Sequence, residues 1–120
     1  MRIAFAAAEL TPWVSTGGLG EVVAALPKAL AALGHDVAVY VPLYRQVRQS
    51  VGARGARLVD TGAVSHVWMG GNRVDARVFR IAEESRTVAL QSGKFEAVSR
   101  RSGIGRTGEV HYVALRCRLQ

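Results

Sequence analysis

The chain has 120 residues, about the length of one domain, and its 16 basic and 9 acidic residues give a formal net charge of +7. Hydrophobic residues at 49% and charged residues at 21% are close to globular averages, which argues against a wholly disordered chain. The longest apolar runs fall well short of the roughly 20 residues of a membrane-spanning helix, and the run after Arg2 is too short for an export signal, so we expect neither.

The first part of the chain has the pattern of a strand, a helix and a second strand. Residues 2–8 form an apolar run of the kind found in strands buried on both faces of a parallel sheet. Apolar residues at helical spacing predict a helix over 20–33, with Gly34 at the position of a C-terminal capping glycine. The interior Pro27 should kink this helix. Residues 36–41 are again apolar, so the segment predicts a βαβ unit with its two strands parallel.

The predicted loop over residues 9–19 is longer than the 2–6 residues usual between a strand and a helix in α/β proteins. Loops at the carboxyl ends of parallel strands are where such proteins bind ligands. The length and position of this loop therefore predict a ligand site.

Weaker patterns follow the second strand. Residues 44–51 have the spacing of a short amphipathic helix, and Gly70-Gly71-Asn72 supplies the turn of a β-hairpin near 63–82. The apolar runs that predict strands are 58–61, 63–69, 73–82 and 87–90. From Gln91 onward glycine and arginine are scattered without periodicity, and no element is predicted there.

The basic excess is concentrated near the end of the chain, in an arginine-rich tail over residues 91–120. Its arginines outnumber its acidic residues, and Tyr112 is the one aromatic residue after Val98. A basic tail can bind nucleic acid, but the absence of interleaved aromatics and of any zinc-knuckle or RNP pattern makes a solvated tail the favoured interpretation. The single cysteine, Cys117, excludes an intrachain disulfide and is typical of a cytoplasmic protein.

The sequence Ser15-Thr16-Gly17-Gly18-Leu19-Gly20 opens the predicted helix. Glycines adopt unusual backbone conformations and let a ligand approach closely, and the free N–H groups of a helix start favour an anion such as phosphate. The segment matches neither a Walker A loop nor the G-x-G-x-x-G fingerprint, since position 23 is valine. A tight turn without a ligand is the alternative.

Three further stretches, taken with this loop, resemble the amino terminus of bacterial glycogen synthases and plant starch synthases. They are Ala8-Glu9-Leu10-Thr11-Pro12, Ala25-Leu26-Pro27-Lys28-Ala29-Leu30 and Gly34-His35-Asp36-Val37. The resemblance runs from residue 1 to about 48 and includes the proline inside the helix. It divides the chain into 1–90, part of an amino-terminal catalytic domain, and 91–120, whose arginine-rich end does not resemble the family.

The resemblance implies an α/β fold, a partial Rossmann-like doubly wound parallel sheet that forms the amino-terminal half-domain of a GT-B architecture. It also implies a retaining glycosyltransferase that moves glucose from ADP-glucose, or in some members UDP-glucose, onto an α-1,4-glucan without a metal or other cofactor. Residues 15–20 would then form the nucleotide-sugar loop, and Glu9 and Glu21 would be the catalytic carboxylates. Glu21 also suits the positive end of the helix dipole without any catalytic role.

Three departures from the family accompany this resemblance. The acidic residue after the loop, usually aspartate in the family, is Glu21 here. The loop lysine of the family is Ser15 here, which replaces a charge-assisted hydrogen bond to phosphate by a neutral one of about half the strength. The chain is also too short for the two domains of the family, so we expect an amino-terminal fragment whose carboxyl-terminal domain is missing. A non-catalytic glucan-binding or regulatory module is the alternative function.

Overall fold

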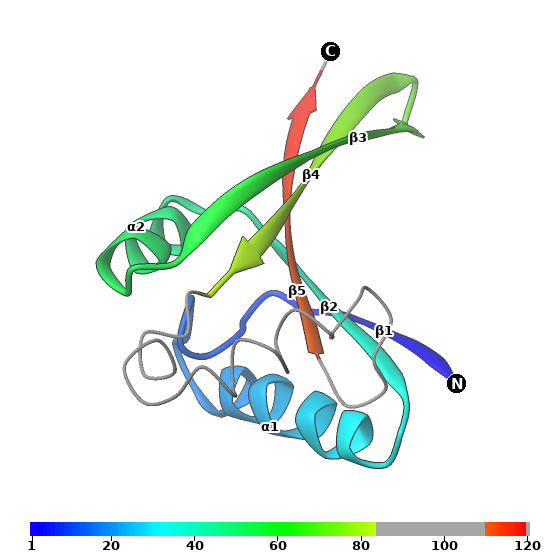
Figure 1. Ribbon diagram of the computed structural model, residues 1–120. Helices are drawn as coiled ribbons and strands as arrows, with labels where there is room; N and C mark the ends of the chain where they lie inside the picture. The colour runs from blue at the N-terminus through cyan, green and yellow to red at the C-terminus, as the bar shows by residue number, and fades with distance from the viewer. Residues whose placement is uncertain (84–109, 120) are drawn as a thin grey trace.

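The computed structural model describes residues 1–83 and 110–119, which form one mixed β-sheet with two helices (Figure 1). The strand order in this part of the chain is β1-β2-β5-β4-β3. The three strands β1, β2 and β5 run parallel to one another. Strand β4 is antiparallel to β5, and β3 is antiparallel to β4. The α/β class and the partial Rossmann-like sheet implied by the resemblance are therefore confirmed, with an antiparallel hairpin as the second half of the sheet.

The predicted βαβ unit is present at the start of the chain. Strand β1 (Arg2–Ala6) pairs in parallel with β2 (Asp36–Pro42), and helix α1 (Gly18–Ala32) connects them. Gly34 follows the helix with a φ of 93°, the left-handed conformation expected of a capping glycine. The helix runs on through Pro27, and that ring is buried on the side of α1 that faces the molecule.

The predicted hairpin is also present. Helix α2 (Arg45–Ala53) leads into β3 (Arg57–Met69), which pairs with β4 (Asn72–Ala82) through the glycine turn. Two predicted strands are joined into the single strand β3, with an irregularity in the pairing between Asp60 and Val64. The extra residues of such a bulge break the strict alternation of side chains, which explains why the sequence pattern showed two strands.

Strand β5 (Val110–Leu119) is an element that the sequence did not predict. It lies between β2 and β4, in the middle of the sheet, although it belongs to the arginine-rich segment 91–120. Its outer end alternates arginine with Cys117 and Leu119, a pattern that suits a half-exposed strand but does not stand out in a glycine- and arginine-rich sequence. The predicted strand 87–90 lies outside the described residues.

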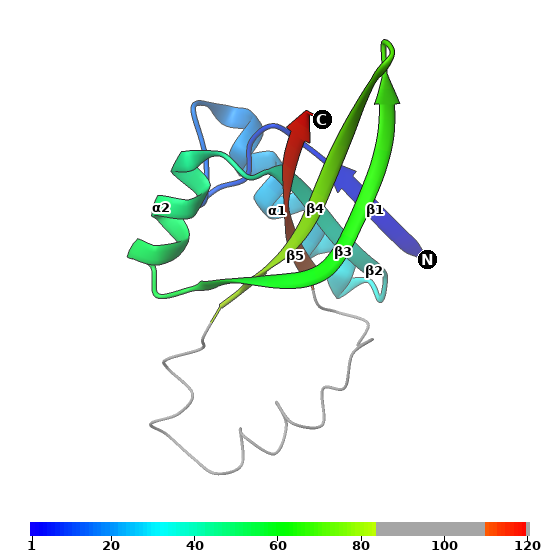
Figure 2. The same cartoon turned by 90° about the horizontal axis from the view of Figure 1, so that it is seen from above.

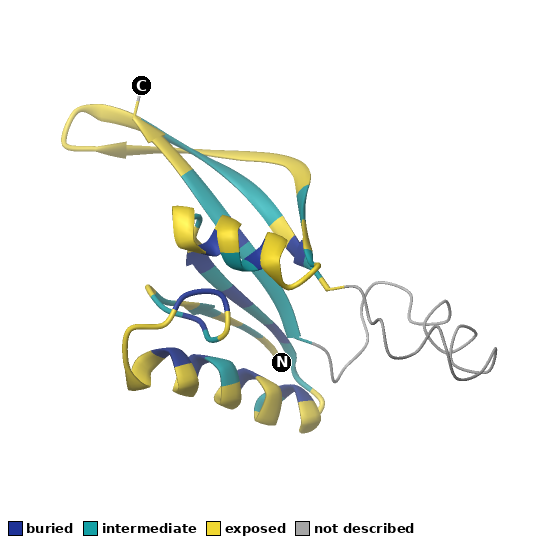
Figure 3. Ribbon diagram, turned by 90° about the vertical axis from the view of Figure 1, so that its left-hand side faces the viewer, coloured by how far each residue is buried: buried dark blue, intermediate teal, exposed yellow. Residues whose placement is uncertain are grey.

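Both helices pack on the same face of the sheet. Val39 and Val41 of β2 belong to the same buried cluster as Val23 of α1 and Val47 and Val51 of α2. Because side chains alternate along a strand, these two β2 valines point to one face. Figure 3 shows the resulting pattern, with the buried stretches between the helices and the sheet and an exposed hairpin beyond them.

Candidate functional site

The loop between β1 and α1 is fixed to the core by three apolar side chains. Leu10, Trp13 and Val14 are all buried, and they join the cluster formed by the sheet and the two helices. Within the loop, the N–H groups of Trp13 and Val14 donate to the carbonyl of Leu10 at 2.8 and 3.0 Å. These anchors hold the loop in one place at the carboxyl end of β1, where the sequence predicted a ligand site.

The carboxylate of Glu9 binds the loop just before α1 and the first turn of the helix itself. Its Oε1 accepts hydrogen bonds from the hydroxyl and from the N–H of Thr16, the latter at 3.3 Å. Its Oε2 accepts the N–H of Gly20 at 3.2 Å. Gly17, the N-cap residue of α1, has no side chain to cap the helix, so Glu9 satisfies one of the orphan amides of the first turn from a distance.

Three amides at the helix start stay open to solvent. Gly17, Gly18 and Leu19 are exposed, and within residues 1–83 and 110–119 no protein acceptor binds their N–H groups. Free amides and the helix dipole together favour an anion at this end of α1. The fourth amide, that of Gly20, is already bound by Glu9, and anion binding by the other three stays a prediction.

The reason for glycine differs from one position of the loop to another. None of the loop glycines has a positive φ, and a side chain at Gly17 or Gly18 would meet nothing within 4 Å. The expectation that these two glycines adopt conformations forbidden to other residues is therefore wrong for the structure described. At Gly20 an added Cβ would lie 2.8 Å from Oγ1 of Thr11 and 3.0 Å from Oγ of Ser15. Glycine is needed there because the helix start passes so close to the loop.

The other predicted site residues lie around this loop. The hydroxyl of Ser15 donates to the carbonyl of Gly17 at 3.3 Å, so it turns back onto the loop. Leu19 and Glu21 are exposed on the first turn of α1, and Glu21 makes no hydrogen bond or ion pair with a described residue. Of the two predicted carboxylates, Glu9 is hydrogen-bonded to Thr16 and Gly20, whereas Glu21 is exposed on the first turn of α1.

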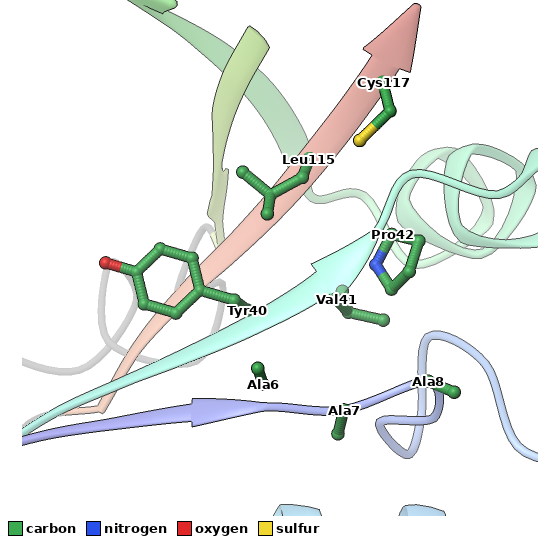
Figure 4. A pocket seen from close by; sticks show the side chains of 8 residues that line it. All are labelled: Ala6, Ala7, Ala8, Tyr40, Val41, Pro42, Leu115 and Cys117. Atoms are coloured by element: carbon green, nitrogen blue, oxygen red, sulfur yellow. The ribbon is translucent and has the colours of Figure 1, made fainter. Parts of the chain in front are cut away.

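A shallow hollow, which the sequence did not predict, adjoins the start of this loop. It lies over the ends of β1 and β2 and the neighbouring part of β5 (Figure 4). The residues that line it are mostly apolar: Ala6, Ala7, Ala8, Tyr40, Val41, Pro42, Leu115 and Cys117. Only the run Ala6-Ala7-Ala8 after the first strand could have indicated it, because Leu115 and Cys117 come from the strand that the sequence missed.

In residues 1–83 and 110–119 there is no group of three or more histidine, cysteine, aspartate or glutamate side chains placed to hold a metal ion. No helix in the same ranges is long and apolar enough to cross a membrane.

The chain is similar to known proteins over this same region. The family described as "Starch synthase catalytic domain" matches residues 2–111, which extends past residue 48 into the arginine-rich segment that we expected not to resemble the family. A glycogen synthase of Koribacter versatilis is 62% identical over 48 residues, 40% of this chain and 10% of the relative. A glycogen synthase of Aromatoleum aromaticum is 58% identical over 59 residues, 49% of this chain and 12% of the relative.

The alignment with a plant protein is longer than these two. Granule-bound starch synthase 1 of Zea mays is 40% identical over 79 residues, 66% of this chain and 12% of the relative. The chain thus spans about a tenth of the length of the curated relatives it matches. The resemblance carried by the loop and the helix is confirmed, and the chain belongs to the starch synthase catalytic domain family.

Proposed function

We propose that this chain supplies the amino-terminal, nucleotide-sugar-facing part of a glucosyltransferase that moves glucose from ADP-glucose to an α-1,4-glucan. The observation that carries the proposal is the exposed start of α1, whose free amides at Gly17, Gly18 and Leu19 lie at the carboxyl end of β1. Family membership supports the reaction class. The donor nucleotide, UDP-glucose being the alternative, rests on the resemblance.

The three free amides are the groups we assign to the departing nucleoside diphosphate. Donors aimed at the place where negative charge develops stabilise a transition state, and fixed amides do so without moving. Glu9 acts in this proposal as a positioning residue, because its carboxylate is occupied with Thr16 and Gly20 and holds the amides in place. Glu21, exposed beside them, is the carboxylate that remains open to substrate.

Ser15 sets the strength of diphosphate binding in this proposal. Its hydroxyl donates to the carbonyl of Gly17. Because serine carries no charge, position 15 places no cation beside a phosphate. We propose that the remaining charge is balanced by basic groups of a second Rossmann-like domain and that no metal or organic cofactor is required. The chain alone should therefore bind ADP weakly, with a Kd on the order of 1 mM, and should not transfer glucose at a family-like rate.

The test is a titration of the purified chain with ADP, in which NMR monitors the amide chemical shifts of the loop. We expect shifts at Gly17, Gly18 and Leu19 with millimolar affinity, and a Kd several-fold lower in Ser15→Lys. Gln49→Lys, on the exposed side of α2, adds the same charge away from the loop and is the matched control. An equal gain in both variants, or shifts that avoid the loop, would contradict the proposal.

An activity assay tests the second step separately. The chain is incubated with ADP-glucose and a malto-oligosaccharide, and both chain extension and ADP release are followed. We expect no extension by the chain alone. The contrary outcome is extension by the chain alone that is lost in Gly17→Val with unchanged stability. It would show that the loop supports transfer without a second domain, and the proposal that a second domain is needed would be wrong.

A further inference from the structure

The arginines of β4 and β5 gather on one face of the sheet beyond the helices. Arg77 of β4 lies directly opposite Arg116 of β5, and Asp75 lies opposite Arg118. Directly paired residues share a face, as do residues two apart on one strand, so Arg73 belongs to the same row. We call the five residues Trp68, Arg73, Arg77, Arg116 and Arg118 the arginine face.

The charges on this face are only partly balanced. Arg73 Nε lies 3.1 Å from Asp75, and a nitrogen of Arg77 lies 3.3 Å from Asp60. Arg116 and Arg118 have no carboxylate partner within residues 1–83 and 110–119, and the guanidinium of Arg116 lies over the Phe79 ring, 5.7 Å from its centre.

Like charges directly opposite one another on adjacent strands are unfavourable, so Arg77 and Arg116 gain from an anion placed between or above them. The face therefore favours a ligand with more than one negative charge.

An aromatic ring stands at the end of the same face. Trp68 of β3 pairs with Arg73 of β4, and its side chain is 71% exposed. Figure 2 shows the hairpin of β3 and β4 extending beyond the rest of the sheet, with β5 alongside. A flat exposed ring beside a row of guanidinium groups is the arrangement that binds single-stranded nucleic acid, because bases stack on the ring while arginines contact the phosphates.

We propose that the arginine face binds single-stranded nucleic acid, with Arg116 and Arg118 on the phosphates and a base stacked on Trp68. The site is separate from the loop at the start of α1 and does not depend on the proposed transferase. The sequence favoured a solvated tail because aromatic residues are scarce among its arginines. The fold supplies the missing ring from a distant hairpin.

The test uses the full chain and a fluorescein-labelled oligothymidylate of about 15 nucleotides, the upper range of site sizes for a single binding domain. Binding is followed by anisotropy over a series of salt concentrations. Each phosphate contact contributes a slope of about −0.7 to the plot of log affinity against log salt. Replacing both Arg116 and Arg118 by Gln should therefore reduce the slope by about 1.4 and weaken binding.

Three further variants distinguish the loss of this binding site from a loss of net charge and from misfolding. Arg45→Gln with Arg48→Gln, on the exposed side of α2, removes the same charge elsewhere and should leave the slope nearly unchanged. Arg116→Lys keeps the charge and should keep the slope. Trp68→Ala should weaken binding about 5-fold or more with the slope unaltered. An equal slope loss in the α2 variant, unchanged binding in Trp68→Ala, or equally tight binding of duplex DNA would overturn the proposal.

Discussion

Glu9 and Gly20 are joined by a hydrogen bond that spans the whole candidate loop. The carboxylate oxygen Oε2 of Glu9 accepts the amide of Gly20 at 3.2 Å, although the two residues are eleven positions apart. Helices commonly begin with a residue whose own side chain accepts such an amide. Here the N-cap is a glycine, so Glu9, three residues beyond the end of β1, takes over that role and ties the start of the loop to the start of the helix.

This bond predicts that Glu9 contributes to stability as well as to ligand binding. Glu9→Ala should lower the free energy of unfolding by about 0.5–2 kcal/mol, the usual cost of a lost helix cap. Glu9→Gln keeps one carbonyl oxygen as an acceptor and should lose less. Urea unfolding followed by circular dichroism measures both, and equal stability of Glu9→Ala and the wild type would show that the bond has no structural role.

The close approach at Gly20 predicts opposite behaviour for two glycines of one loop. Gly20→Val should lower the free energy of unfolding by about 1–3 kcal/mol, because the new side chain meets Thr11 and Ser15. Gly18→Val, where the space is open, should change it by no more than about 0.5 kcal/mol. Thermal or urea unfolding of the two variants side by side is the measurement. Similar losses in both would mean that the backbone, and not the contact at Gly20, requires glycine.

The two tryptophans should differ sharply in their effect on stability. Trp13 is 1% exposed and anchors the loop, so Trp13→Ala should cost about 3–5 kcal/mol. Trp68 is 71% exposed, so Trp68→Ala should stay within about 0.5 kcal/mol of the wild type. Iodide quenching of fluorescence checks the same assignment without a stability measurement, because only Trp68 should be accessible. Strong quenching of the Trp68→Ala variant would contradict the buried position of Trp13.

The surroundings of Asp75 lead us to predict how the stability of the folded chain changes in acid. A hydrogen bond from His66, whose Nδ1 lies 2.5 Å from Oδ1, and the nearby Arg73 hold the pKa of the Asp75 carboxyl below its ordinary value of 3.8. The folded state then binds this proton less readily than the unfolded chain. Its contribution to stability is complete above the ordinary pKa and is lost as the pH falls through the lower folded-state value.

Titration of the Asp75 carboxyl by NMR checks this assignment. We expect a pKa below 3.8 in the wild type and a rise in His66→Ala that exceeds the rise in Arg73→Ala, because the bond from His66 is the largest cause of the shift. Asp75→Asn should remove this part of the acid dependence of unfolding. An unchanged pKa in His66→Ala would exclude the hydrogen bond as the cause.

The local sequence by itself determined the βαβ unit, the hairpin and the place of the loop. Each of these depends on neighbours in the chain: apolar residues at strand or helix spacing, the capping Gly34, and the turn glycines before Asn72. The family motif in residues 15–20 is local in the same way, which is why the membership of the family could be predicted and was confirmed.

The tertiary structure alone decided the features that join distant segments. Strand β5 enters the middle of the sheet because β2 and β4 offer it hydrogen bonds on both sides, and nothing in its scattered arginines indicates that pairing. Trp13 is buried because the sheet and both helices meet over it, whereas its neighbours in sequence are those of an exposed loop. Glu9 caps a helix from a distance only because the chain returns past the end of β1. Long-range contacts of this kind leave no periodic pattern, so the sequence could name the residues of the loop but could not assign Glu9 its role in holding them.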